Sequence, residues 1–303
     1  MPTCLPSLRS VRAVGTVALV LSLSSLLSPA HADGFWQISD LGALGGFQFQ
    51  NFGINAAGQV TGYSQILATS NYHAFRTAPN GAIGDPSADL GTLGGSQSFG
   101  YGINNSGQVT GDSDLTGDLV FHAFRTTATG TLDDATATDF GTLGGSNSSG
   151  AAINALGMVA GTSDTTGDVN AHAFRSSANG AGSVSLTDLG TLGGDNSSAW
   201  GINTAGQVVG DSEDSDFVPR AFLYTDGVGM QDLNGFLNPD DQNFWFLLSA
   251  SGINDNGQIV GFGVLNGEAH AFLLTTTPEP GSIALLGSLG IVGAGFLRRR
   301  RRP

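Results

Sequence analysis

Histidine and aspartate recur in this sequence at fixed spacing, and both can carry protons or bind metals. The histidines lie in His-Ala-Phe triplets and the aspartates in Asp-Leu-Gly triplets. Each triplet holds the same place in successive copies of a longer repeat, so a repeat-built fold would keep copies of one side chain far apart. We therefore interpret both as structural, because buried polar groups are nearly always hydrogen-bonded. The histidines concerned are His73, His122, His172 and His270, and Arg220 takes the histidine place in the fourth copy.

An acidic stretch gives the strongest candidate for a cofactor site. Asp112, Asp114 and Asp118 alternate around Gly117 as ligands do in the first half of an EF-hand loop. The closing glutamate is missing, because Ala123 stands at the twelfth position. Two interpretations stay open: a weak Ca²⁺ site of extracellular type, or a solvated acidic loop, which we favour. We predict no other cofactor.

The sequence contains no recognised catalytic pattern. G-x-S-x-G, H-E-x-x-H and the phosphate-binding loop are all absent. We therefore predict no catalytic residues and a protein that is not an enzyme. The alternative is a glycan-active enzyme, a glycosidase or lyase, which would need non-equivalent carboxylates on one face of the fold. The aromatic run Phe244–Phe246 could stack on sugars, but we favour a role in filling the core of the last repeat.

The elements that position these residues come from a repeat of about 49 residues. In the fourth copy we expect an opening strand at 185–189, a glycine-rich turn at 190–194, and further strands at 198–202, 207–212 and 220–224. Four short antiparallel strands, repeated five times, are typical of propeller blades.

The predicted fold is therefore all-β, a five-bladed β-propeller, with a β-solenoid as the alternative. A closed ring removes the exposed ends that a solenoid must cap, and we find no capping segment. The repeat domain spans 33–277. Its five repeats cover roughly 34–80, 81–130, 131–180, 181–226 and 227–277.

Charge and cysteine content exclude several classes of function. The body at 33–277 carries 24 acidic residues against four arginines and no lysine. Such a surface repels nucleic acid and anionic lipid, so we predict no nucleic-acid partner. The single cysteine, Cys4, lies near the start of the chain, so the body contains no disulfide and no thiol chemistry.

The first 32 residues read as a secretory signal peptide. Arg9 and Arg12 precede an apolar run over 14–27, and an A-x-A cleavage site ends at Ala32. At the other end, an apolar segment over 283–297 is short for a spanning helix and is followed by arginines that would stay cytoplasmic. On these grounds alone the tail at 278–303 is a weak membrane anchor.

The same tail resembles a PEP-CTERM sorting signal, which exosortases of exopolysaccharide-producing Gram-negative bacteria recognise. Its three parts stand in the expected order: Pro278, Glu279 and Pro280, then the apolar segment, then Arg298, Arg299, Arg300, Arg301 and Arg302. The resemblance implies an exosortase partner, cleavage near 278–280, and only transient contact with the membrane.

The repeats resemble the HAF-repeat group of extracellular proteins. The His-Ala-Phe triplets carry this resemblance, together with the Asp-Leu-Gly-Thr-Leu-Gly-Gly runs, and it implies secretion without an established reaction. Together with the two terminal signals, it predicts a protein exported across the inner membrane to the cell surface or the medium. We expect a non-enzymatic surface or matrix protein that associates with exopolysaccharide or with other surface proteins.

Overall fold

The computed structural model describes residues 40–67, 69–134, 137–179 and 185–275. The predicted signal peptide (1–32) and sorting tail (278–303), with its apolar segment at 283–297, lie outside these ranges. Within the ranges, every helix is too short or too polar to cross a membrane.

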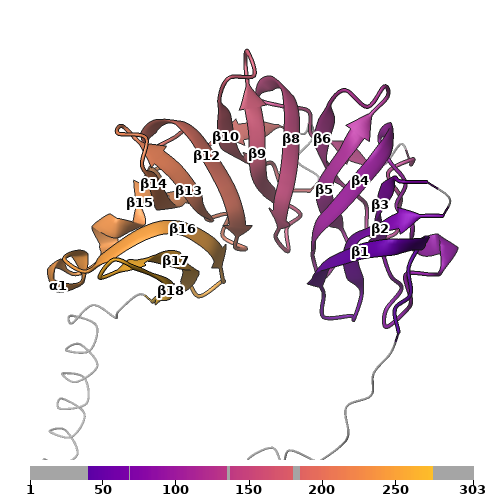
Figure 1. The fold of residues 1–303 in the computed structure, drawn as a ribbon, viewed down its shortest axis with the longest axis horizontal. Helices are drawn as coiled ribbons and strands as arrows, with labels where there is room; N and C mark the ends of the chain where they lie inside the picture. Colours follow the sequence, from indigo (N-terminus) through magenta and orange to yellow (C-terminus); the bar gives the residue numbers. More distant parts are fainter. Residues whose placement is uncertain (1–39, 68, 135–136, 180–184, 276–303) are drawn as a thin grey trace, which may run out of the picture. The chain divides into compact units, whose positions relative to one another are not determined.

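The described chain forms five antiparallel sheets that follow one another in sequence order (Figure 1). Sheet 1 contains β1 (Gly45–Ile54), β2 (Val60–Ile66) and β3 (Tyr72–Arg76). Sheet 2 contains β4 (Gly94–Ile103), β5 (Val109–Leu115), β6 (Phe121–Arg125) and β7 (Thr138–Asp139). Sheet 3 contains β8 (Gly144–Ile153), β9 (Val159–Thr165), β10 (Ala171–Ser176) and β11 (Leu186–Asp188). Sheet 4 contains β12 (Gly193–Ile202), β13 (Val208–Asp214), β14 (Pro219–Thr225) and β15 (Gly229–Asp232). Sheet 5 contains β16 (Trp245–Ile253), β17 (Ile259–Leu265) and β18 (Glu268–Leu274).

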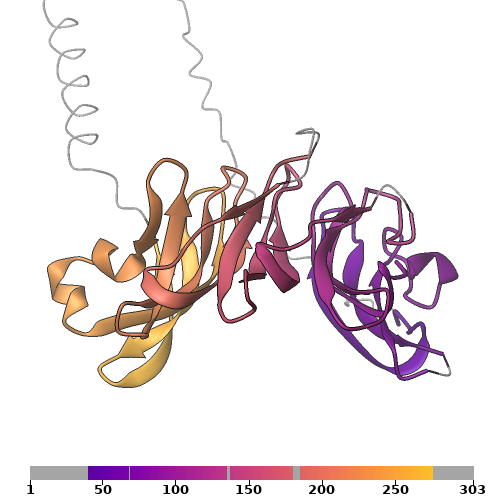
Figure 2. The same cartoon turned by 90° about the horizontal axis from the view of Figure 1, so that it is seen from above.

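Helical structure in the described ranges is limited to three single-turn connections: η1 (Pro86–Ala88), η2 (Leu233–Phe236) and α1 (Pro239–Gln242). Within each sheet the strands run antiparallel and twist, as strands of L-residues do (Figure 2). The all-β prediction, with one sheet for each repeat, is confirmed.

The strand that carries Asp-Leu closes a sheet and does not open one, so the predicted strand order within a repeat was wrong. β11 pairs with β10, with Asp188 opposite Phe174, and β15 pairs with β14 in the same way. The predicted boundaries at 130/131, 180/181 and 226/227 therefore fall inside sheets 2, 3 and 4. The physical reason is that a periodic sequence reads the same from any starting point, so its period does not fix which strand begins a sheet.

The second strand of each of sheets 2 to 5 contains a glycine that the backbone geometry requires: Gly111, Gly161, Gly210 and Gly261. In sheet 3 the register of β8 and β9 shifts between Gly150 and Ala152, which marks a β-bulge. The bulge brings the Ser149 carbonyl oxygen against Gly161, where an added Cβ would lie only 2.0 Å from that oxygen. Close approach of two strands therefore explains the Gly161 position.

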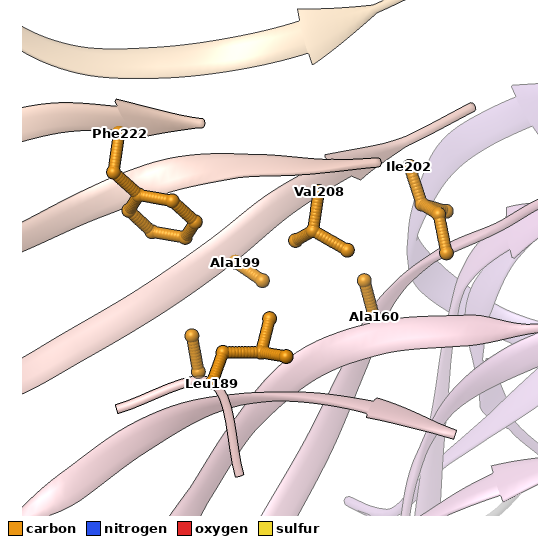
Figure 3. Close-up of a cluster of buried hydrophobic side chains, with 7 residues drawn as sticks. Ala160, Leu189, Ala199, Ile202, Val208 and Phe222 are labelled. Carbon is orange, nitrogen blue, oxygen red and sulfur yellow. The ribbon is translucent and has the colours of Figure 1, made fainter. Parts of the chain in front are cut away.

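The hydrophobic core lies between neighbouring sheets. Phe222 from β14 and Val208 from β13 pack with Ala160 of sheet 3 and with Leu189, which follows β11 (Figure 3). Alanine at positions 160 and 199 leaves room for the larger side chains between the sheets. The phenylalanine of each of the first four triplet positions is fully buried: Phe75, Phe124, Phe174 and Phe222.

A hydrogen-bonded relay of asparagines links the sheets at the turn after each first strand. The Nδ2 of Asn55 donates to the Asn104 carbonyl at 3.1 Å, and the bond repeats from Asn104 to Asn154 and from Asn154 to Asn203. The last bond, from Asn203 to the Asn254 carbonyl, is 3.3 Å. Each sheet is therefore tied to the next by the Ile-Asn pair that the sequence repeats.

The first strands of sheets 2 to 5 meet around a shared space. One pocket of about 320 Å³ is lined by the Ile-Asn turns of all four sheets, including Asn104, Asn154, Asn203 and Asn254. A solenoid stacks its repeats along a line, so four successive repeats would not line one pocket. The sheets are therefore blades of a β-propeller, with the first strand of each sheet innermost.

Candidate ligand-binding site

The repeated histidines pair with the repeated aspartates. His73 Nδ1 lies 2.9 Å from Asp89, His122 Nδ1 lies 2.8 Å from Asp139, and His172 Nδ1 lies 2.9 Å from Asp188. Burial opposes ionisation of Asp89, but the hydrogen bonds from His73 and from the Gly91 amide hold the pKa of its carboxyl below the ordinary value. Because the same pair joins the third strand of three sheets to the Asp-Leu segment that follows it, the pair belongs to the scaffold.

In the fourth copy, Arg220 replaces the histidine and makes different contacts. Its Nε lies 2.8 Å from Asp214 Oδ2, and its guanidinium lies 4.1 Å from the centre of the Phe246 ring. Trp245, beside Phe246, packs against the core between sheets 4 and 5. Two aromatics of the run at 244–246 are thus engaged in packing, and Phe244 is exposed.

The acidic stretch of sheet 2 has its carboxylates turned toward different partners. Asp112, on β5, accepts a hydrogen bond from Ser149 Oγ of sheet 3 at 2.7 Å. Asp118, in the following turn, accepts from the Ser96 amide at 2.7 Å. Burial and the charge of Asp118 raise the pKa of Asp114. In the part of the chain that the structure describes, no group of three His, Cys, Asp or Glu side chains is placed to hold a metal ion.

The turn carboxylate has the same role in the next sheet. Asp168 accepts from the Ser146 amide at 2.6 Å and from Ser146 Oγ at 2.7 Å. These bonds tie the turn after the second strand to the start of the first strand of the same sheet. The arrangement favours a structural role for Asp118, which stands at the matching place in sheet 2.

A concave site opens beside the innermost strands, where two pockets share Trp200 and Ser251. One pocket, of about 560 Å³, is also lined by Asp211 and Phe262. The other, of about 430 Å³, is also lined by Tyr101. These side chains come from sheets 2, 4 and 5, and 47% of the surface of Trp200 is exposed. We call this region the Trp200 pocket.

One carboxylate, Asp211, lines the Trp200 pocket, and a second, Asp112, is buried behind it and accepts a hydrogen bond from the lining residue Ser149. Asp211 accepts hydrogen bonds from Trp200 Nε1 at 2.5 Å and from Ser249 Oγ at 2.9 Å, which fix the indole ring. Asp112 is 8% exposed, and this burial raises the pKa of its carboxyl to about 6. Burial, followed by the neighbouring charge of Asp112, raises the pKa of the Tyr101 hydroxyl in turn. The pocket thus combines aromatic surface with hydrogen-bond acceptors, a composition typical of ligand sites.

The Trp200 pocket could not be found from the triplets that recur in every copy, because these triplets are nearly the same in each repeat. Tyr101, Ala151, Trp200 and Ser251 line the site from matching places on the first strands of their sheets. Asp112 and Asp211 likewise occupy matching places on second strands, opposite Phe99 and Ser198. The residues that line the pocket stand at positions where the repeats differ in residue type, and this difference could have indicated the site.

We predict that Asp112→Asn stabilises the protein near neutral pH. The folded pKa of about 6 lies above the ordinary value, so the native state binds the proton more tightly than the unfolded state. Between about pH 4 and 6 stability therefore falls as pH rises, and the loss is complete above pH 6. Removing the charge should raise the free energy of unfolding by about 3 kcal/mol at pH 7.5, because the pKa rises from 3.8 to about 6 and each pKa unit corresponds to about 1.4 kcal/mol.

The measurement is denaturant unfolding of both proteins at pH 4 and pH 7.5. The two curves should nearly coincide at pH 4, where Asp112 is neutral in both states. Equal stability of wild type and variant at pH 7.5 would contradict the prediction.

No family model and no curated protein matches this sequence. Among solved structures, one described as "putative TolB from Agrobacterium tumefaciens" is similar, with a TM-score of 0.43 and 14% sequence identity. The alignment covers 73% of this chain and 72% of that chain. The fold assignment above rests on the sheets and their contacts, and the functional argument rests on the Trp200 pocket.

Proposed function

We propose that this protein is an exported, non-enzymatic surface or extracellular-matrix protein that binds polysaccharide in the Trp200 pocket. The observation that carries the proposal is an exposed indole, held by Asp211, at the border of a concave site. The aliphatic face of a sugar ring can pack on such an aromatic surface, while its hydroxyl groups donate to carboxylate and hydroxyl oxygens.

The charge of the body narrows the class of polysaccharide. With 24 acidic residues and four arginines between residues 33 and 277, the surface repels polyanions. An acidic exopolysaccharide would meet this repulsion along its whole length. Neutral or amino-sugar polymers therefore fit the proposal best.

Export and sorting belong to the same proposal. The signal peptide at 1–32 would direct the chain across the inner membrane, and an exosortase would process the tail at 278–303. Both segments lie outside the described residues, so the support for this step is the sequence pattern alone.

A glycan-active enzyme is the second candidate, and the state of Asp112 is the observation that favours it. A carboxyl with a pKa of about 6 can serve as a general acid, and Asp211 lines the same region of the fold. Glycosidases use two carboxylates in this way. Release of new reducing ends from polysaccharide, lost in Asp112→Asn, would favour this candidate.

Binding is tested by titrating the protein with neutral and amino-sugar oligosaccharides and measuring the heat of binding by calorimetry. We predict that Trp200→Ala weakens binding at least tenfold, because aromatic anchors in concave sites carry much of the binding energy. Phe236→Ala is the matched control, since Phe236 is 56% exposed but lies outside the Trp200 pocket. Equal affinities of the wild type and Trp200→Ala would remove the Trp200 pocket from the proposal.

A further inference from the structure

The arrangement of side chains at Trp200 has a counterpart two sheets earlier. In each arrangement, a carboxylate on a second strand accepts hydrogen bonds from an aromatic residue of the first strand and from a serine of the next sheet. The strand registers match the two arrangements residue by residue. The Trp200 group consists of Trp200, Asp211 and Ser249, and the Tyr101 group consists of Tyr101, Asp112 and Ser149.

Hydrogen bonds hold the ring of the Tyr101 group in place. The Tyr101 hydroxyl and Ser149 Oγ both donate to the Asp112 carboxylate, the serine at 2.7 Å. Asp112 is 8% exposed, whereas Tyr101 and Ser149 line the Trp200 pocket. A ring that is already held in one orientation loses little conformational freedom when a ligand packs on it.

The two groups open into one space. Tyr101 and Ser149 line the part of the Trp200 pocket of about 430 Å³, and Trp200 lines it as well. Sheet 3 stands between the sheets that carry the two rings (Figure 1). Its lining residue is Ala151, at the place that an aromatic residue holds in sheets 2 and 4. This small side chain leaves the space between the two rings open to a ligand.

Each group has an apolar residue beside it on the third strand. Pro219, opposite Glu213, lines the part of the Trp200 pocket of about 560 Å³. Phe121 holds the matching place in sheet 2, opposite Asp114, and is 37% exposed. Asp112 and Asp114 stand two residues apart on β5, so Phe121 lies on the same face of the sheet as Asp112. Phe121 thus extends the apolar surface of the Tyr101 group.

The matching places on sheets 1 and 3 hold other residues. Between sheets 1 and 2, the ring of Tyr63 packs against Phe99, with centroids 4.9 Å apart, and against Tyr72, with centroids 5.5 Å apart. These rings fill the space that a ligand would need. Sheet 3 has Thr162 at the carboxylate place and Ala151 at the aromatic place. The arrangement therefore distinguishes sheets 2 and 4 and does not follow from the repeat alone.

We propose that the Tyr101 group and Phe121 form a second sugar subsite, and that the ligand is an internal stretch of one polysaccharide chain that covers both subsites. This inference rests on the polysaccharide binding proposed above. In each subsite the apolar face of a sugar packs on the aromatic ring, and sugar hydroxyls bond to side-chain oxygens. A chain bound at one subsite meets the other at high effective concentration, so affinity grows with chain length.

Oligomers of N-acetylglucosamine test the second subsite: the disaccharide, which is short enough for one subsite, and the hexasaccharide, which can reach both. Calorimetry on the full-length protein should show the hexasaccharide binding at least about tenfold more tightly than the disaccharide. Tyr101→Ala should weaken hexasaccharide binding at least about fivefold. Phe121→Ala should do the same and leave disaccharide affinity within about twofold, because the disaccharide binds at the indole of Trp200.

Leu119→Ala is the matched control. Leu119 is 90% exposed and lies two residues before Phe121, but it lines neither part of the Trp200 pocket. Its replacement should change neither affinity. Phe121→Ala, at a partly exposed position, keeps the test valid if Tyr101→Ala does not fold. Glucose oligomers of the same two lengths serve as the neutral probes.

The second subsite and the proposed function fail in different ways. Hexasaccharide binding that is unchanged in Tyr101→Ala and Phe121→Ala, but weakened in Trp200→Ala, would overturn the second subsite alone. An equal loss for both sugars in Phe121→Ala would also overturn it, because that pattern is expected if Phe121 only supports the fold around Trp200. If no oligomer binds the wild type, the proposed function fails and the second subsite fails with it.

Discussion

Replacing Gly161 by alanine should destabilise the protein by more than about 3 kcal/mol. The new Cβ would lie 2.0 Å from the Ser149 carbonyl oxygen, and that oxygen belongs to backbone that cannot rotate away. The first two strands of sheet 3 would have to separate at the bulge. Denaturant unfolding measures the loss, and a fall in soluble yield should accompany it.

Gly235→Ala is the matched control for this substitution. Gly235 lies in η2, has no atom within 4 Å of the added Cβ, and does not have a positive φ. Its replacement should change the free energy of unfolding by less than about 0.5 kcal/mol. If the two variants were equally stable, the close approach of β8 and β9 at Gly161 would be wrong.

Asn154→Ala should cost about 3 kcal/mol, because the side chain serves two sheets at once. Asn154 Oδ1 accepts from the amides of Leu156 and Met158 at 3.0 Å each, and Nδ2 donates to the Asn203 carbonyl of sheet 4 at 2.9 Å. Asn154 is 5% exposed. Alanine leaves these partners without their hydrogen bonds, and each unsatisfied buried group costs about 1–3 kcal/mol.

The control variant for Asn154→Ala is Asn256→Ala, which lies in the corresponding turn of sheet 5. Asn256 is exposed, and its side chain makes no hydrogen bond to another described residue. Thermal and chemical unfolding should place this variant within about 0.5 kcal/mol of the wild type. A loss of similar size for both asparagines would mean that the relay between sheets does not stabilise the fold.

Much of the architecture could be predicted from the sequence because five copies of the repeat show the same pattern of strands and turns. The spacing of His122 and Asp139 recurs in sheets 1 and 3, so one repeated contact explains several positions. The Asn-x-x-Gly turn after each first strand follows from local chemistry, because an asparagine side chain can accept from backbone amides two to four residues further on, as Asn154 does. These features are local, and short-range chemistry is what a sequence shows best.

The features that could not be predicted depend on which sheet a residue contacts across space. Asp188 looked like part of an opening strand, yet its partner is Phe174, earlier in the chain. The Trp200 pocket brings together side chains from matching places in different repeats at which the residue type varies, such as Tyr101, Ala151 and Trp200. Comparing repeats for what they share hides the positions at which they differ, and the side chains of the candidate site stand at those positions.

The most direct test of the account is the intact mass of the protein in the exopolysaccharide fraction of the parent cells. We predict a chain that begins near Asp33 and ends near residues 278–280, and that neutral or amino-sugar oligosaccharides release from the polymer. This result would establish export, processing and glycan binding together. A full-length chain that stays in the inner membrane, and is absent from the polysaccharide, would contradict it.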